Sequence, residues 1–116
     1  MNKAYKFALL VIAGQLQGFA TLFRKKNRTV ADWLNWAGQA IQDVMLDVTV
    51  RTAPALNDQY GSPIPDNWKE RFQIAAVQAS SLALAIRNYD DNFDGTDDKV
   101  ATVLEKIATA LDVLGN

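Results

Sequence analysis

The chain of 116 residues is 49% hydrophobic and 22% charged, and its formal net charge is −1. This composition is too apolar and too nearly neutral for a disordered protein, and the length fits one domain, residues 1–116, around a single core. The sequence has no cysteine and no histidine, which excludes disulfides, thiolate nucleophiles, Cys/His zinc sites, Ser-His triads and histidine pH switches.

Charge is distributed unevenly along the chain. The first 28 residues have no acid and carry a charge of +6, from Lys3, Lys6, Arg24, Lys25, Lys26 and Arg28. The rest of the chain has six bases and all thirteen acids, a charge of −7. Such a separation bears on association with partners more than the net charge does.

Hydrophobic periodicity predicts four helices and no strand. The first helix is expected over about residues 3–25, where apolar side chains recur at intervals of three and four. The second is expected over about residues 30–51, with Thr29 and Asp32 as a capping box and its end before Pro54. All three prolines lie in residues 52–66, which predicts a long connection.

The third helix is expected over about residues 67–89, with Asp66 or Asn67 as its cap. It is apolar nearly all round its middle, which predicts the most buried element. The fourth is expected over about residues 97–114, with Thr96 as its N-cap. Four such helices predict an all-α four-helix bundle. An antiparallel chain path is the simplest, but the long connection could carry the chain across the bundle, so the topology stays open.

The first predicted helix contains an uncharged run of seventeen residues with Gly14 and Gly18 at the spacing found where membrane helices pack closely. The run is at the short limit for a membrane span and includes Gln15 and Gln17, and no convincing signal-peptide cleavage site follows it. We therefore expect a bundle helix in which both glycines pack against a neighbouring helix, in a protein of the cytoplasm or of a viral particle. A membrane-associated helix is the alternative.

Residues 90–98 carry the best local motif, DDNFDGTDD. From Asp90 it resembles the first half of an EF-hand or dockerin calcium loop, which implies oxygen ligands from Asp90, Asn92, Asp94, Thr96 and Asp98. Ala101 stands at position twelve, where these loops place a bidentate acid. A polar interhelical turn is therefore the favoured interpretation, with a weak calcium site as the alternative.

A basic cluster at the junction of the first two helices could bind an anion, through Arg24, Lys25, Lys26 and Arg28. The cluster has no aromatic platform beside it and the isoelectric point is about 5.2, which argues against a nucleic-acid partner. A solvated loop or a subunit contact is the favoured interpretation.

Seven apolar residues fall outside the predicted core stripes and are expected to form an interface: Phe7, Leu10, Leu46, Val50, Ile74, Val77 and Leu84. The carboxylates of Asp43 and Asp47 have no partner that would complete a catalytic site.

The sequence therefore predicts a non-enzymatic interaction or assembly protein without a cofactor, a repeated subunit or adaptor that binds itself or another protein. Its size would suit a small viral or phage structural protein. A calcium-dependent interaction module is the second hypothesis, and a membrane-associated protein is the third.

Overall fold

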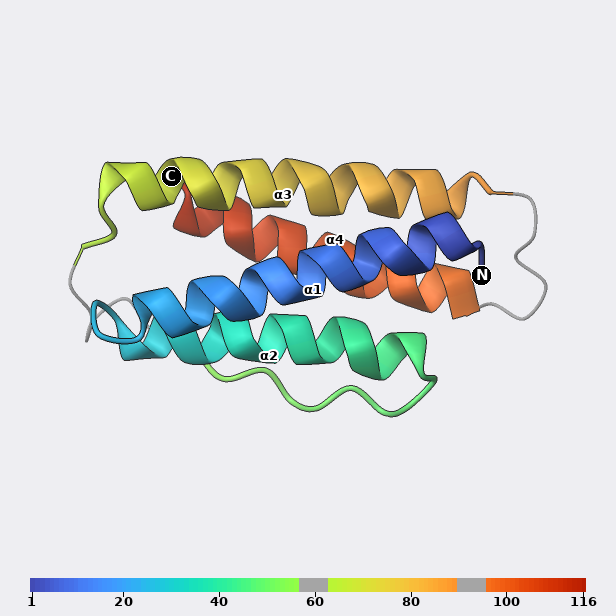
Figure 1. Ribbon diagram of the computed structural model, residues 1–116, viewed down its shortest axis with the longest axis horizontal. Helices are drawn as coiled ribbons and strands as arrows, with labels where there is room; N and C mark the ends of the chain where they lie inside the picture. The colour runs from blue at the N-terminus through green and yellow to red at the C-terminus, as the bar shows by residue number, and fades with distance from the viewer. Residues whose placement is uncertain (57–62, 90–95) are drawn as a thin grey trace.

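The computed structural model describes residues 1–56, 63–89 and 96–116. It contains four helices, α1 (Lys3–Phe23), α2 (Arg28–Met45), α3 (Asp66–Arg87) and α4 (Thr96–Leu114), and no strand in those ranges. The helices form one elongated bundle, which confirms the predicted fold class (Figure 1).

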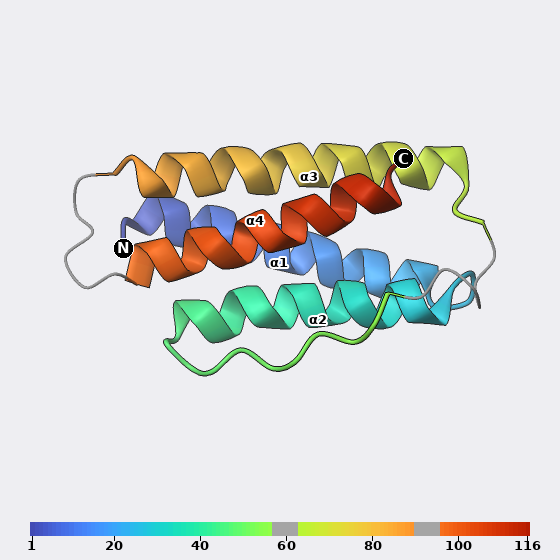
Figure 2. The same cartoon turned by 180° about the vertical axis from the view of Figure 1, so that it is seen from behind.

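The helices are arranged as two antiparallel hairpins. α1 packs along α2 and α3 packs along α4, while smaller contacts of α2 with α4 and of α1 with α3 join the hairpins. Figures 1 and 2 show that α2 and α3 run in the same direction, so the connection between them carries the chain back along the bundle. As a result, all four of these packed pairs are antiparallel, and the topology that the sequence left open is settled.

The turn between α1 and α2 is built on Asn27 rather than on the predicted capping box. The buried Asn27 side chain accepts a hydrogen bond from the Val30 amide at 3.1 Å, which makes Asn27 the N-cap and starts α2 at Arg28. The amides of Lys26 and Asn27 both donate to the Phe23 carbonyl, which closes α1 two residues before the predicted end.

The end of α2 is the largest departure from the predicted elements, because the helix stops at Met45 and not near residue 51. Asp47 has a left-handed backbone with φ 55°, and the Val48 amide donates to the Asp43 carbonyl at 2.9 Å. The Asp47 amide donates to the Val44 carbonyl at 3.2 Å, which completes a Schellman motif. Three β-branched residues follow, and they have little tendency to continue a helix.

The connection then returns along the surface of α2 and is fastened by Arg51. Its carbonyl accepts a hydrogen bond from Trp36 Nε1 at 2.8 Å, and its guanidinium donates to Gln39 Oε1 at 2.7 Å. Arg51 Nε also lies 3.4 Å from Asp43 Oδ2. These three contacts hold the segment against the helix that precedes it.

α3 and α4 differ from the prediction by one or two residues at their ends. Pro65 is the N-cap of α3, with no side-chain capping bond, and the predicted cap residue Asp66 is the first residue of the helix. α3 ends at Arg87, and α4 begins at Thr96, which had been expected as its cap. Boundary shifts of this size are normal at helix ends.

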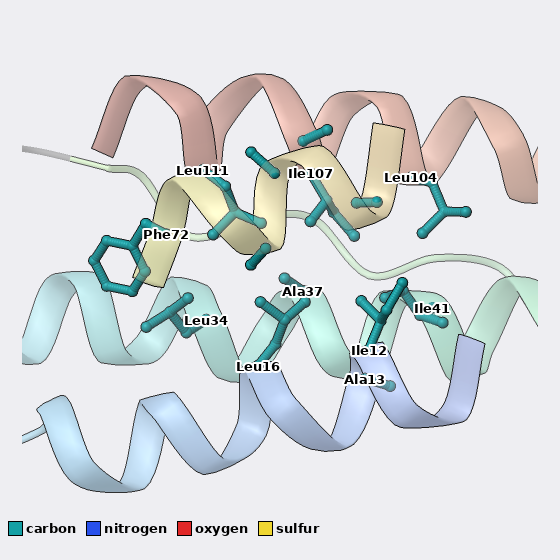
Figure 3. Packing of buried hydrophobic residues seen from close by; sticks show 14 of the residues in the cluster. Ile12, Ala13, Leu16, Leu34, Ala37, Ile41, Phe72, Leu104, Ile107 and Leu111 are labelled. Carbon is teal, nitrogen blue, oxygen red and sulfur yellow. The ribbon is translucent and has the colours of Figure 1, made fainter. Parts of the chain in front are cut away.

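The core draws large aliphatic side chains from α1, α2 and α4 and mainly small ones from α3. Figure 3 shows Leu16, Leu34, Phe72 and Ile107 between the helices. Four of the seven buried residues of α3 are alanines, whereas nine of the eighteen residues of α2 are buried. The expectation that the third helix is the most buried is therefore wrong, because Ile74, Val77 and Leu84 point away from the core.

Close approach of α1 and α2 depends on Gly38. A Cβ atom there would lie 2.6 Å from Gln17 Cγ and 2.8 Å from the Ala13 carbonyl oxygen. Gly14 and Gly18, by contrast, have nothing within 4 Å of an added Cβ. The prediction that these two glycines pack against a neighbouring helix is wrong within the chain, because they lie on the outer face of α1.

We predict opposite effects for one substitution at two glycines. Gly38→Ala should destabilise the fold by about 1–3 kcal/mol, because the Ala13 carbonyl can yield only if α1 moves. Gly14→Ala should stabilise it by about 0.5–1 kcal/mol, because alanine is the better helix former where space is open. Urea unfolding of both variants measures the two changes, and equal effects would contradict the assigned packing.

Candidate functional site

Two outward-facing apolar surfaces are the most distinctive features of the described residues. The first, the α1 face, consists of Phe7, Leu10, Val11 and Leu22 with Gly14 and Gly18 between them. The second, the α3 stripe, consists of Ile74, Val77, Ser81 and Leu84. All of these residues are exposed, and the apolar side chains among them are at least half exposed. Surfaces of this kind mark sites of association.

The structure assigns five of the seven predicted interface residues to the two surfaces and places the other two elsewhere. Phe7 and Leu10 belong to the α1 face, and Ile74, Val77 and Leu84 belong to the α3 stripe. Leu46 is 74% exposed at the end of α2, apart from both surfaces. Val50 is partly buried against the core, so it is not an exposed residue as the sequence implied. Val50 was predicted to lie off the core stripe because the helix was expected to reach residue 51, but α2 ends at Met45.

The α1 face was only partly identified from the sequence. Val11 and Leu22 are missing from the predicted set although they are 52% and 64% exposed. Val11 lies three residues before Gly14 and Leu22 lies four residues after Gly18, at spacings that repeat along one face of a helix. The glycines themselves were the usable signal, since small residues at this spacing often mark a helix face that contacts another body.

The described residues also line hollows, and those that involve α3 border the α3 stripe. One is lined by the end of α2 and the start of α4, where Lys99 Nζ lies 3.7 Å from Asp47 Oδ1. Another lies between α3 and α4, with Ala76, Ser80, Ala108 and Thr109 in its wall. A third is shallow and lies on α3 alone, around Ile74 and Val77.

The predicted calcium ligands fall only partly within the described residues. Asp90, Asn92 and Asp94 lie outside them, as does the side chain of Thr96. Asp98 lies in the first turn of α4, where its Oδ1 is 3.6 Å from Arg87 Nη1. The described residues contain no group of three acidic, histidine or cysteine side chains placed to hold a metal ion.

Arg87 ties the end of α3 to the start of α4. Its guanidinium donates to Glu105 Oε1 and to Thr102 Oγ1 and pairs with Asp98. The hydrogen bond with Glu105 raises the pKa of Arg87 above its ordinary value. Asp98 is therefore already partnered by a positive charge.

One buried carboxylate was not anticipated. Asp97 is only 2% exposed, and its Oδ2 has no hydrogen-bond partner in the part of the chain that the structure describes. The sequence indicated only that an acid in the first turn of a helix complements the helix dipole. No sequence pattern distinguishes a buried acid at this position from an exposed one.

The predicted anion-binding cluster is exposed at the tip of the first hairpin. Arg24, Lys25, Lys26 and Arg28 surround the buried Asn27, and none of them pairs with an acid that the structure describes. Lys3 and Lys6, at the other end of α1, are also exposed without such a pair. The α1 face is thus bounded by cations at both ends.

Comparison of the chain with protein families, with curated proteins and with solved structures finds no match.

We predict that calcium and magnesium at equal ionic strength change the melting temperature equally. Both ions should only screen the clustered acids around residues 90–98, because position twelve lacks a carboxylate. Thermal unfolding of the wild type and of Asp94→Ala tests this expectation. A calcium-specific rise that Asp94→Ala abolishes would instead establish a weak calcium site.

Proposed function

We propose that this protein is a non-enzymatic helical subunit that assembles with copies of itself through the α3 stripe. The observation that carries the proposal is an outward row of Ile74, Val77 and Leu84 on a helix whose residues 72–86 include no charged side chain. When another such face covers it, this face buries apolar surface, which stabilises the contact. The cost of removing charged groups from water is absent, because the face carries no charge.

The α3 stripe is self-complementary in an antiparallel pairing. A two-fold axis at the level of Ala79 would set Ile74 of one copy opposite Leu84 of the other, and Val77 opposite Ser81. The shallow apolar hollow around Ile74 would then receive the Leu84 side chain of the second copy. Isologous contacts of this kind are the commonest basis of homodimers.

The residues that flank the stripe agree with this register. Glu70 at one end would lie level with Asn88 of the second copy, where an amide can donate to the carboxylate. Arg71 is held over the Trp68 ring at 4.6 Å and Arg87 is held by Glu105. Neither arginine is therefore free to occupy the apolar centre.

The expected dimer is weak. One pair of helices is a small contact by the standard of stable interfaces, so we expect a dissociation constant on the order of 10 µM. The earlier expectation that such an assembly belongs to a virus or phage particle stays a prediction, as does the calcium-dependent alternative.

We predict that reciprocal charged substitutions identify both the surface and its register. Ile74→Glu alone and Leu84→Lys alone should each weaken self-association at least about ten-fold, because each buries unpaired charges. An equimolar mixture should recover a dimer, since one Glu–Lys pair and one unchanged Ile–Leu contact would form at the interface. Sedimentation velocity from about 1 to 100 µM measures these species.

Val113→Glu on α4, which alters an equally exposed apolar residue outside the stripe, is the matched control. It should leave the mass of the wild type unchanged. A wild type that remains monomeric over the whole range contradicts the proposal, and failure of the mixture to associate contradicts the antiparallel register.

A further inference from the structure

The outer face of α1 is unexpectedly apolar for a helix so little buried. α1 is long and apolar enough to cross a membrane by length and composition, yet only 33% of its most apolar stretch is buried in the bundle. Phe7 is 71% exposed, and Val11 and Leu22 continue the same arc. Burial in the core therefore does not account for the apolar character of this helix.

Cations bound the α1 face at both ends. Lys3 and Lys6 precede it, and Arg24, Lys25 and Lys26 follow it, while the first acid of the chain is Asp32. The face from residue 7 to residue 22 is about 22 Å long at the helical rise of 1.5 Å per residue. Helices that lie in a membrane interface bury an apolar face at the headgroup boundary, and their lysines and arginines are attracted to anionic lipid.

We propose that the α1 face docks on the surface of an anionic lipid bilayer, with the axis of α1 lying along the membrane plane. Phe7, Val11 and Leu22 would enter the boundary between headgroups and acyl chains. The lysines and arginines at the two ends would reach lipid phosphates, and their aliphatic stems would cover apolar surface. This inference is independent of self-association through α3.

Charge favours a bilayer over a second copy of α1. Two α1 faces in contact would bring one set of cations against another in either orientation, with no acid before Asp32 to compensate. An anionic membrane offers the opposite charge along the whole length of the face.

Burial favours docking at the surface over a membrane span. The opposite side of α1 places Leu9, Leu16 and Phe23 in the core at 0% exposure. Insertion of α1 across the bilayer would remove these side chains from the bundle, whereas docking at the surface leaves them in place.

The test is co-sedimentation of the full chain with vesicles of phosphatidylcholine alone and with vesicles that also contain phosphatidylglycerol. We expect binding to the anionic vesicles only, and we expect high salt to weaken it. Phe7→Ser should reduce the partition coefficient about ten-fold, and Lys25→Gln about five-fold. Val113→Ser and Lys106→Gln replace an exposed apolar residue and an exposed lysine of α4, outside both apolar surfaces, and should have no effect.

Several results would overturn the proposal. These are no binding to anionic vesicles, equal binding to both vesicle types, or binding that neither α1 variant changes. Binding that resists extraction by alkaline carbonate would indicate a membrane span instead. A change of native mass in Phe7→Ser without vesicles would assign the face to a protein partner.

Circular dichroism checks that each variant is folded. The Leu84→Lys variant, which is expected to be monomeric, should still bind vesicles, and this separates the test of membrane docking from that of self-association.

Discussion

The left-handed turn at the end of α2 is the constraint on which the arrangement of the bundle depends. The amides of Asp47 and Val48 donate the two backbone hydrogen bonds that close the helix, and the chain then runs back along the helix it has just left. Arg51 then holds the returning segment against Trp36, Gln39 and Asp43. α3 consequently begins at the same end of the molecule as α2.

The return of the chain makes the two pairs between the hairpins, α1 with α3 and α2 with α4, antiparallel, as the pairs within the hairpins already are. Helix dipoles then oppose one another across every main contact, which is the electrostatically favourable arrangement. It also places the two hairpins side by side, with α1 and α3 meeting only through a small contact. Small residues have different roles in this bundle. Gly38 and the alanines of α3 lie where helices pack closely, whereas Gly14 and Gly18 lie on the outer face of α1 without a neighbour.

The two exposed apolar surfaces differ in their electrostatic surroundings, and this difference separates their proposed roles. The α3 stripe is uncharged along its centre and has acids and bases near its ends, so a second copy can cover it without like-charge repulsion. The α1 face has cations at both ends and no neighbouring acid along the sequence, so a copy of itself would be repelled and an anionic surface attracted. One molecule could use both surfaces together, because they lie on different helices.

The sequence by itself was sufficient for the number of helices, their approximate positions and most of the exposed apolar residues, because helical periodicity directly records which face is buried. The sequence was insufficient for the end of α2. Pro54 predicted an end near residue 51, whereas the helix ends at Met45 because Asp47 adopts a left-handed backbone. Periodicity also says nothing about which neighbour a small residue meets, so the close contact was assigned to Gly14 and Gly18 rather than to Gly38. Burial of Asp97 and the partial burial of Val50 were decided only by tertiary structure, because each depends on segments that are distant in sequence packing over it.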